Sequence, residues 1–341
     1  DLVHALEGQL AASRYGAAVR LEISHKCPDD LCDFLLDHFS MERAELFTVD
    51  GPVNLNRLAA VCEMANRPDL CYPEFTPGTP KALKSDAGIF AILRKQNVLL
   101  QHPYQSFAPV VDFIATAATD PDVMAIKQTL YRTGSDSPIV EHLVRAATAG
   151  KEVTAIIELM ARFDEAANIS LANQLQEAGA HVVYGLVGYK THAKMSLVVR
   201  REQNKFRRYV HLGTGNYHPR TALHYTDYSY FSSSQKLGSD VHKIFMQLTS
   251  LTAATELDRI LTAPFNLFDE MMRRIDREIE FAKDGQDARI IAKINSLTAS
   301  RIIDALYRAS AAGVKINLIV RGICSLRPGV PGLSENIRVC S

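Results

Sequence analysis

The 341-residue sequence predicts an α/β fold with mixed, mainly parallel sheets, preceded by a small α/β domain. From about residue 120, short apolar runs alternate with helical patterns long enough to cross over between parallel strands. The same strand–helix–strand pattern recurs near residue 300, which indicates a duplicated domain. A proline-rich stretch separates both copies from an earlier α/β region.

The first region ends at this proline-rich stretch. Residues 73–80, PEFTPGTP, contain three prolines and a glycine, which sustain neither a helix nor a central strand. We therefore expect a domain boundary here, with the first domain covering residues 1–78. Within it, the predicted strands span residues 17–23 and 45–49, and the predicted helices span residues 28–38 and 54–64.

The second region should contain the main sheet, in which an antiparallel hairpin follows a parallel part. Residues 195–200 and 207–212 are apolar runs around the polar sequence 201–205, which predicts a turn. The basic residues of this hairpin, Arg200 and Arg207 among them, favour a solvated tip over an anion site. The parallel part is predicted from strands 123–128, 153–159 and 181–184 and helices 139–149 and 164–178.

An internal repeat carries the prediction of a duplicated domain. Residues 139–153, IVEHLVRAATAGKEV, resemble residues 302–316, IIDALYRASAAGVKI. A lysine-bearing strand precedes each copy, with Lys127 in the first and Lys293 in the second. Two copies of one α/β unit predict two similar domains with pseudo-twofold symmetry, and a coincidence between two amphipathic helices is the alternative.

His192 and Lys194 are the leading candidates for chemistry. They lie two residues apart in GYKTHAKMSLVVR, residues 188–200, whose apolar second half predicts a buried strand with both side chains on one face. A neutral imidazole can attack phosphorus while an adjacent cation offsets charge on the phosphoryl oxygens. The pair favours phosphoryl or phosphodiester chemistry through a phosphohistidine, and a hydrogen-bonded structural histidine is the alternative.

A glycine-rich segment follows this motif. In HLGTGNYHP, residues 211–219, the glycines permit close approach of the backbone and Asn216 offers an amide. We expect a phosphate group to be held between this segment and the H-x-K motif.

Composition limits the classes of partner. The 38 basic and 38 acidic residues give zero net charge, so the chain has no overall bias toward polyanions, and we expect no nucleic-acid partner. No apolar stretch approaches membrane-spanning length and the first residues do not resemble a signal peptide. We expect a cytoplasmic protein and leave peripheral membrane association open.

Several motifs carry a resemblance to known families. A duplicated α/β domain bearing H-x-K and then G-x-G-N resembles the phospholipase D superfamily, although Val199 stands where that pattern has an aspartate. Longer stretches are similar to bacterial polyphosphate kinase of the first type, and the likeness runs through nearly the whole chain. These stretches are AIKQTLYRTG (125–134), KTHAK (190–194), LGTGNY (212–217) and LIVRGICSLRPG (318–329).

This resemblance implies reversible transfer of the terminal phosphoryl group of ATP to inorganic polyphosphate. His192 matches the phosphorylated histidine, and Lys194 matches its charge-stabilising neighbour. Tyr225 matches a nucleotide-binding tyrosine whose ring could stack on adenine, with packing in the core as the alternative. Arg321 matches a nucleotide-contacting arginine, for which a surface salt bridge is the alternative.

The resemblance also implies a Mg²⁺ site, with which the family associates two arginines that match Arg132 and Arg162. Because a guanidinium has no lone pair to offer, we expect both to bind phosphate oxygens beside the metal, with surface salt bridges as the alternative. Cationic surroundings should lower the pKa of the His192 imidazole and keep it neutral.

The domain organisation implied by the family has three parts. Residues 1–78 would be a middle, head-like, dimer-forming domain truncated at its start, residues 79–259 the first phospholipase D-like catalytic domain, and residues 260–341 a second one truncated at its end. The expected partners are ATP or ADP, polyphosphate and further copies of the chain in a dimer or tetramer. A second histidine is expected beyond Ser341, so independent catalysis by this stretch is not expected.

Two other functions stay open. A phospholipase D-like phosphodiester hydrolase would use His192 and release the intermediate to water, but Val199 and the long kinase-like motifs disfavour it. A non-catalytic polyphosphate-binding protein would have lost its site, yet His192, Lys194 and the matching arginines are all present.

Overall fold

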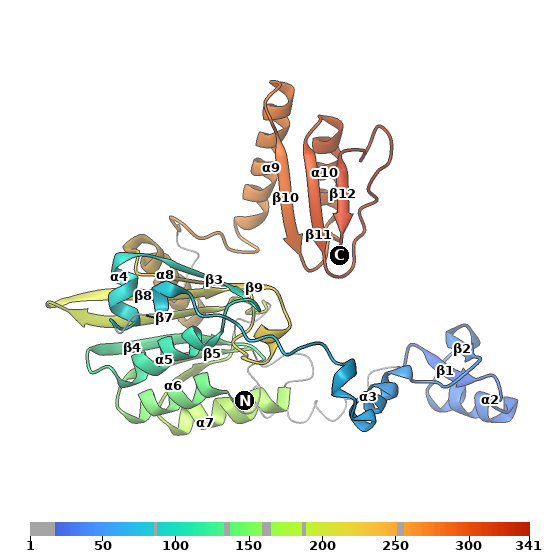
Figure 1. Cartoon of the computed structure of the whole chain (residues 1–341), viewed down its shortest axis with the longest axis horizontal. Helices are drawn as coiled ribbons and strands as arrows, with labels where there is room; N and C mark the ends of the chain where they lie inside the picture. Colours follow the sequence, from blue (N-terminus) through green and yellow to red (C-terminus); the bar gives the residue numbers. More distant parts are fainter. Residues whose placement is uncertain (1–17, 85–86, 133–136, 159–164, 186–188, 251–255) are drawn as a thin grey trace. The chain divides into compact units, whose positions relative to one another are not determined.

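The computed structural model describes residues 18–84, 87–132, 137–158, 165–185, 189–250 and 256–341, and Figure 1 shows its elements. The chain divides into two compact units, residues 1–238 and 239–341. Within the described residues no helix combines the length and the apolar character needed to cross a membrane.

The first unit begins with a small α/β module, as predicted. It contains β1 (Leu21–Ser24), α2 (Asp29–His38), β2 (Leu46–Val49) and α3 (Ala59–Ala65). The two strands pair in parallel across the α2 crossover, and Cys32 and Leu36 form the buried side of that helix. Residue 17, where this strand was predicted to begin, lies outside the described residues, and within them the strand begins at Leu21, where pairing with Leu46 starts.

A seven-stranded mixed sheet forms the rest of this unit, in the order β3-β9-β8-β7-β4-β5-β6. The pairs β4–β5 and β5–β6 are parallel, as predicted, and β7–β8 is the predicted hairpin. Antiparallel pairing also joins β4 to β7, β8 to β9 and β9 to β3. The strands are β3 (Val98–His102), β4 (Val123–Leu130), β5 (Glu152–Ile157), β6 (His181–Val183), β7 (Met195–Glu202), β8 (Lys205–Gly213) and β9 (Asp227–Ser232).

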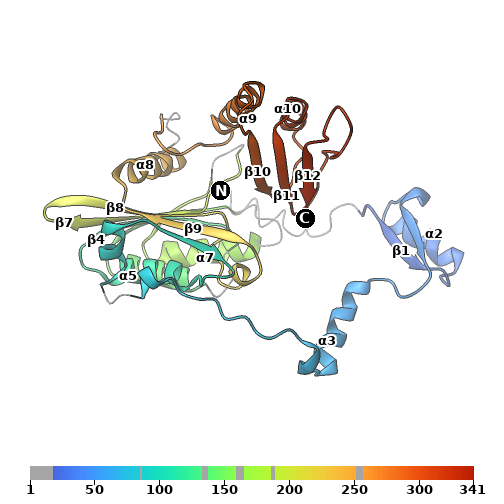
Figure 2. The ribbon, with the colours of Figure 1, turned by 45° about the horizontal axis from the view of Figure 1, so that its top comes forward.

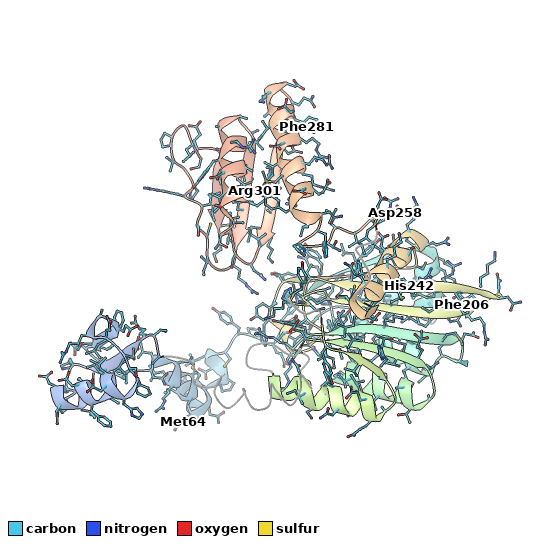
Figure 3. The ribbon with its side chains drawn as sticks, turned by 180° about the vertical axis from the view of Figure 1, so that it is seen from behind. Met64, Phe206, His242, Asp258, Phe281 and Arg301 are labelled. Carbon is cyan, nitrogen blue, oxygen red and sulfur yellow. The ribbon has the colours of Figure 1, made fainter. Side chains whose placement is uncertain are left out.

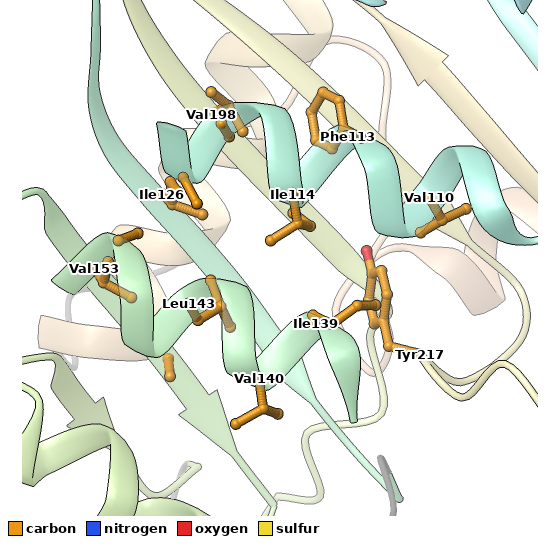
Figure 4. Close-up of a cluster of buried hydrophobic side chains, with 14 of the residues drawn as sticks. Val110, Phe113, Ile114, Ile126, Ile139, Val140, Leu143, Val153, Val198 and Tyr217 are labelled. Carbon is orange, nitrogen blue, oxygen red and sulfur yellow. The ribbon is translucent and has the colours of Figure 1, made fainter. Parts of the chain in front are cut away.

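Three helices cover one face of the sheet, as Figures 1 and 2 show. In Figure 4, Phe113 and Ile114 of the first helix and Leu143 of the second lie over Ile126 and Val198 of the strands, and all five side chains are fully buried. Burying each such side chain stabilises the fold by about 1.5–3 kcal/mol, so this core fixes the strands whose ends carry the candidate site. The helices are α5 (Ala108–Thr119), α6 (Pro138–Thr148) and α7 (Glu165–Glu177), and α4 (Ile89–Lys95) precedes β3.

The second unit is a smaller α/β domain. Helix α8 (Gln235–Ser250) crosses the division between the units, and the strands that follow form a parallel sheet in the order β10-β11-β12. Its remaining elements are α9 (Leu267–Lys283), β10 (Arg289–Ile294), α10 (Ser300–Ala311), β11 (Lys315–Val320) and β12 (Ile337–Cys340). Short 3₁₀ turns occur at Arg43–Glu45, Leu55–Leu58, Pro68–Leu70, Lys81–Leu83 and Thr221–Leu223.

The internal repeat corresponds to matching structure. Both β4–α6–β5 and β10–α10–β11 are parallel strand pairs joined by a helix. Each helix is followed by a glycine with positive φ, 83° at Gly150 and 97° at Gly313. The amide of Gly150 donates to the Ala147 carbonyl and that of Gly313 to the Ser310 carbonyl, both at 2.9 Å. This left-handed helix end explains why both copies carry glycine, and the predicted fold class is confirmed.

Candidate functional site

The H-x-K motif lies just before β7 and not within it. The strand begins at Met195, although the Gly213 amide still donates to the Lys194 carbonyl at 2.8 Å. His192 is exposed, whereas Lys194 is only 7% exposed. The prediction of a strand-borne pair was therefore wrong in detail, because the chain joins the ladder only after His192. The imidazole is open to a substrate while the ammonium is enclosed by protein.

Two side chains from neighbouring strands fix the backbone of the motif. The Thr129 hydroxyl, near the end of β4, donates to the Ala193 carbonyl at 2.8 Å and accepts from the Met195 amide at 3.0 Å. The Glu158 carboxylate, directly after β5, accepts from the Thr191 amide at 2.8 Å. Thr129 and Glu158 are both buried, so these bonds are shielded from water.

One aromatic ring contacts both members of the motif. The Tyr131 ring centroid lies 5.1 Å from that of His192, with the rings nearly perpendicular at 73°. The Lys194 ammonium lies 4.8 Å from the same centroid, and the Arg132 guanidinium and the Lys190 ammonium lie 5.5 Å and 5.8 Å from it. Tyr131 follows β4 directly, and the pairing of β4 with β7 brings it to the motif.

These surroundings favour the neutral imidazole. Protein atoms around the ring desolvate it and lower the pKa of His192, and the positive charges of Lys194, Lys190 and Arg132 lower that pKa further. Burial also lowers the pKa of Lys194 to about 8, partly opposed by the negative charge of Asp227. At pH 7 the lysine is therefore still mainly an ammonium, so the site combines a neutral nucleophile with a cation.

The glycine-rich segment lies against an acid that the sequence analysis missed. The Thr214 hydroxyl donates to Asp227 Oδ1 at 2.8 Å, and a Cβ atom built at Gly215 would lie 2.5 Å from Asp227 Oδ2. A larger residue at 215 would therefore force the Asp227 side chain to move, and glycine permits this close approach. Asn216 and Asp227 line one small pocket, so the structure brings the predicted amide beside this carboxylate.

The remaining predicted residues have different settings. Tyr225 is 44% exposed in the turn before β9, so the alternative of core packing was wrong for this ring. Arg132 lies beside Tyr131, and its charge reaches both His192 and Lys194. Arg321 follows β11 in the second unit and is exposed. Arg162 lies outside the described residues.

A buried histidine near the motif has a structural role. His211 is only 2% exposed, and one of its ring nitrogens is 2.7 Å from the Tyr217 hydroxyl. Burial lowers the pKa of His211 to about 3, with the nearby His102 as a further cause, so His211 stays neutral at physiological pH. His192 and His211 therefore differ in access: the His192 ring is exposed, whereas the His211 ring is enclosed by protein.

Acidic and nitrogen ligands do not gather into a metal cluster in the described part of the chain, where no group of three His, Cys, Asp or Glu residues could hold an ion. Among the described residues, the Glu158 carboxylate at the motif already accepts from the Thr191 amide, whereas the Asp227 carboxylate and the Asn216 amide line the small pocket of the glycine-rich segment and could offer oxygens to an ion. Mg²⁺ is usually held through one or two carboxylates and substrate phosphates, so a single carboxylate fits such an ion when a nucleotide brings the other oxygens.

Comparisons with known proteins point to one family. Residues 1–61 match the family model for the polyphosphate kinase middle domain, residues 88–254 that for C-terminal domain 1, and residues 260–341 that for C-terminal domain 2.

Individual relatives agree with these matches. The chain is 55% identical over its whole length to a polyphosphate kinase of Neisseria meningitidis, of which it covers 50%, and 53% identical to one of Pseudomonas aeruginosa, of which it covers 49%. The crystal structure of polyphosphate kinase from Porphyromonas gingivalis is similar over 95% of this chain and 49% of that chain, with a TM-score of 0.83 and 33% identity. The chain thus spans about half the length of the curated relatives it matches.

Proposed function

The chain belongs to the polyphosphate kinase family, and from this premise we propose that it carries the phosphohistidine site of an ATP:polyphosphate phosphotransferase. His192 is the proposed nucleophile. The observation that carries the proposal is the exposed imidazole at the Tyr131 ring, surrounded by cations that favour its neutral form. A neutral imidazole has the lone pair that attack on phosphorus requires.

The proposed reaction has two reversible displacements. A ring nitrogen of His192 attacks the terminal phosphorus of ATP in line, the bond to the bridging oxygen breaks, and ADP leaves with that electron pair. A terminal oxygen of polyphosphate then attacks the phosphohistidine and regenerates the imidazole. The Lys194 ammonium and the Arg132 guanidinium offset the negative charge on the transferring group in both steps.

Other residues are proposed to bind the nucleotide. The exposed Tyr225 ring can stack on adenine, and the Asn216 amide can donate to a phosphate oxygen. Arg321 is proposed to contact the nucleotide, on the basis of the family motif. Arg162 is proposed, with Arg132, to bind phosphate oxygens beside a Mg²⁺ ion.

Mg²⁺ is the proposed cofactor, and when bound it neutralises charge on the nucleotide phosphates. Asp227 is the carboxylate best placed to help hold it, because this acid lies beside Asn216 and close enough for its charge to affect Lys194.

The domain limits stay as proposed, at residues 1–78, 79–259 and 260–341, and the matched segments 1–61, 88–254 and 260–341 support them. A dimer or tetramer is proposed to form through the first domain. Exposed apolar side chains on and near α3 support this role, among them Leu58, Val61 and Met64, the last of which is labelled in Figure 3. A cytoplasmic location is proposed because ATP is a substrate, and peripheral membrane association is left to experiment.

Labelling of the full-length protein with ATP carrying a radioactive terminal phosphate tests this function. We expect a base-stable, acid-labile label on His192 that transfers to polyphosphate and also to ADP. His192→Asn should abolish the label, and His181→Asn, which changes an exposed histidine at the start of β6, should not. Equal labelling of His192→Asn would overturn the assignment. Loss of the label to water without an acceptor would favour the hydrolase.

A further inference from the structure

Tyr131 is the one side chain of the described site that touches the nucleophile and three cations together. Its ring centroid lies within 6 Å of the Lys194 ammonium, the Arg132 guanidinium and the Lys190 ammonium, at 4.8, 5.5 and 5.8 Å. The His192 ring meets it nearly edge to face, with centroids 5.1 Å apart. Tyr131 is only 8% exposed, so the contacts form on a ring that packing holds in place.

Three like charges around one ring need a compensating attraction. Their mutual repulsion opposes this arrangement, and each contact that holds a cation in place acts against it, including the donation from Lys194 to the His192 carbonyl at 2.6 Å. The negative face of an aromatic ring attracts cations within about 6 Å, and the attraction grows when water is excluded. Lys194 is buried beside Tyr131, so at least one of these contacts lies in the water-poor part of the site.

We propose that Tyr131 is a positioning residue that gathers Lys194, Arg132 and Lys190 around His192 and orients the imidazole for phosphoryl transfer. This inference rests on the proposed role of His192. Tyr131 takes no part in bond making, because it acts through the groups it holds. The same ring would keep the cations together when no phosphate is present to offset their charges.

The electrostatic consequence can be observed at His192 itself. The three cations at the Tyr131 ring are the three whose charges lower the pKa of His192. Two carboxylates also lie near these cations: Asp227 acts in the opposite sense on Lys194, and Glu158 accepts from the Thr191 amide of the motif. If the ring no longer holds the cations, they can move away, and the pKa of His192 should rise toward its ordinary value.

The decisive experiment titrates the His192 imidazole by NMR in the full-length protein labelled with ¹³C-histidine, with the His192 signal assigned by its loss in His192→Asn. Tyr131→Phe keeps the ring, and Tyr131→Leu keeps an apolar side chain without π electrons. We expect the pKa of His192 to be unchanged in the first variant and raised in the second. We also expect histidine labelling at low ATP to slow about tenfold in Tyr131→Leu and to change by less than about threefold in Tyr131→Phe.

Progressively fluorinated phenylalanines at residue 131 provide a matched series if Tyr131→Leu fails to fold. Fluorine withdraws charge from the ring face at nearly constant shape, so the pKa of His192 should rise step by step along the series. A pKa of His192 and a labelling rate that stay constant along this series, or in a folded Tyr131→Leu protein, would overturn the inference.

These outcomes separate the inference from the proposed function. If His192 is not the phosphorylated residue, His192→Asn will still accept label. This outcome does not depend on whether substitutions of Tyr131 change the pKa of His192. If His192 is phosphorylated but Tyr131 does not position the cations, the label will persist at an unchanged rate in the Tyr131 variants.

Discussion

Replacing Lys194 by methionine should stabilise the fold at neutral pH, and the gain should vanish at high pH. Burial lowers the pKa of this lysine from 10.5 to about 8, whereas the unfolded chain restores an ordinary pKa. Below pH 8 the ammonium is charged in both states, and the folded state bears the whole desolvation penalty. The shift of 2.5 units, from 10.5 to 8, corresponds to roughly 3 kcal/mol at 1.36 kcal/mol per unit.

The pH dependence follows from the protons bound in each state. Between pH 8 and 10.5 the unfolded chain binds more protons than the folded protein at this site, so the free energy of unfolding rises with pH. Between pH 7 and pH 10, the titration of Lys194 should raise the free energy of unfolding of the native protein by about 2.5 kcal/mol. Lys194→Met lacks this group and should show no such rise. The penalty is thus complete at pH 7 and mostly relieved at pH 10.

Urea unfolding followed by circular dichroism measures this effect at both pH values. The stability difference between Lys194→Met and the native protein should shrink by about 2.5 kcal/mol on going from pH 7 to pH 10. Lys205→Met, which removes an exposed lysine at the hairpin turn, is the matched control and should show no such change. Groups that titrate alike in the two proteins cancel when their stabilities are subtracted. A stability difference between Lys194→Met and the native protein that is equal at both pH values would therefore refute the reasoning.

Three further substitutions test the supports of the motif. Thr129→Val should lower the free energy of unfolding by about 1–3 kcal/mol and slow histidine labelling, while Thr129→Ser keeps both, because only the hydroxyl bonds the motif backbone. Glu158→Ala should lower stability by about 1–3 kcal/mol in urea unfolding, because a buried amide loses its acceptor. Gly215→Ala should cost about 1–3 kcal/mol, because the new Cβ meets Asp227 at 2.5 Å. A Cβ atom built at Gly78 meets no atom within 4 Å, so Gly78→Ala should leave the free energy of unfolding unchanged. Equal losses of stability at both glycines would contradict the steric argument.

The elements that the sequence predicted well are those with strong local patterns. Helix α6 and its counterpart α10 combine an apolar face with a following glycine, so their repeat could be read without the structure. Strands β3 and β9 were not predicted. β9 carries the polar and aromatic sequence DYSYFS, and β3 joins the sheet through pairing with β9, in which Val98 lies opposite the distant Phe231. Long-range pairing of this kind leaves little trace in local periodicity.

In the candidate site too, features with a local sequence pattern were predicted, and features that depend on long-range pairing were not. The types and spacing of His192 and Lys194 indicated phosphoryl chemistry, but their different exposure depends on where β7 begins. Tyr131 and Thr129 carry no chemical signature in the sequence, since they read as ordinary residues of an apolar run. They reach the motif because β4 pairs with β7. Asp227 was missed because it lies outside both motifs in sequence and comes to the glycine-rich segment through the pairing of β8 with β9.

Net charge alone could not identify an anion site in this chain, because individual cations have very different surroundings. Arg200, in the β7–β8 hairpin, is a structural residue. Its charge is neutralised within the fold by ion pairs with Asp120, Asp122 and Glu202. Lys194 instead donates to the neutral carbonyl of His192 at 2.6 Å. Its field is therefore directed at the imidazole and at any phosphate that approaches. The burial that makes this lysine costly for stability also strengthens its charge interactions, since both effects come from the exclusion of water.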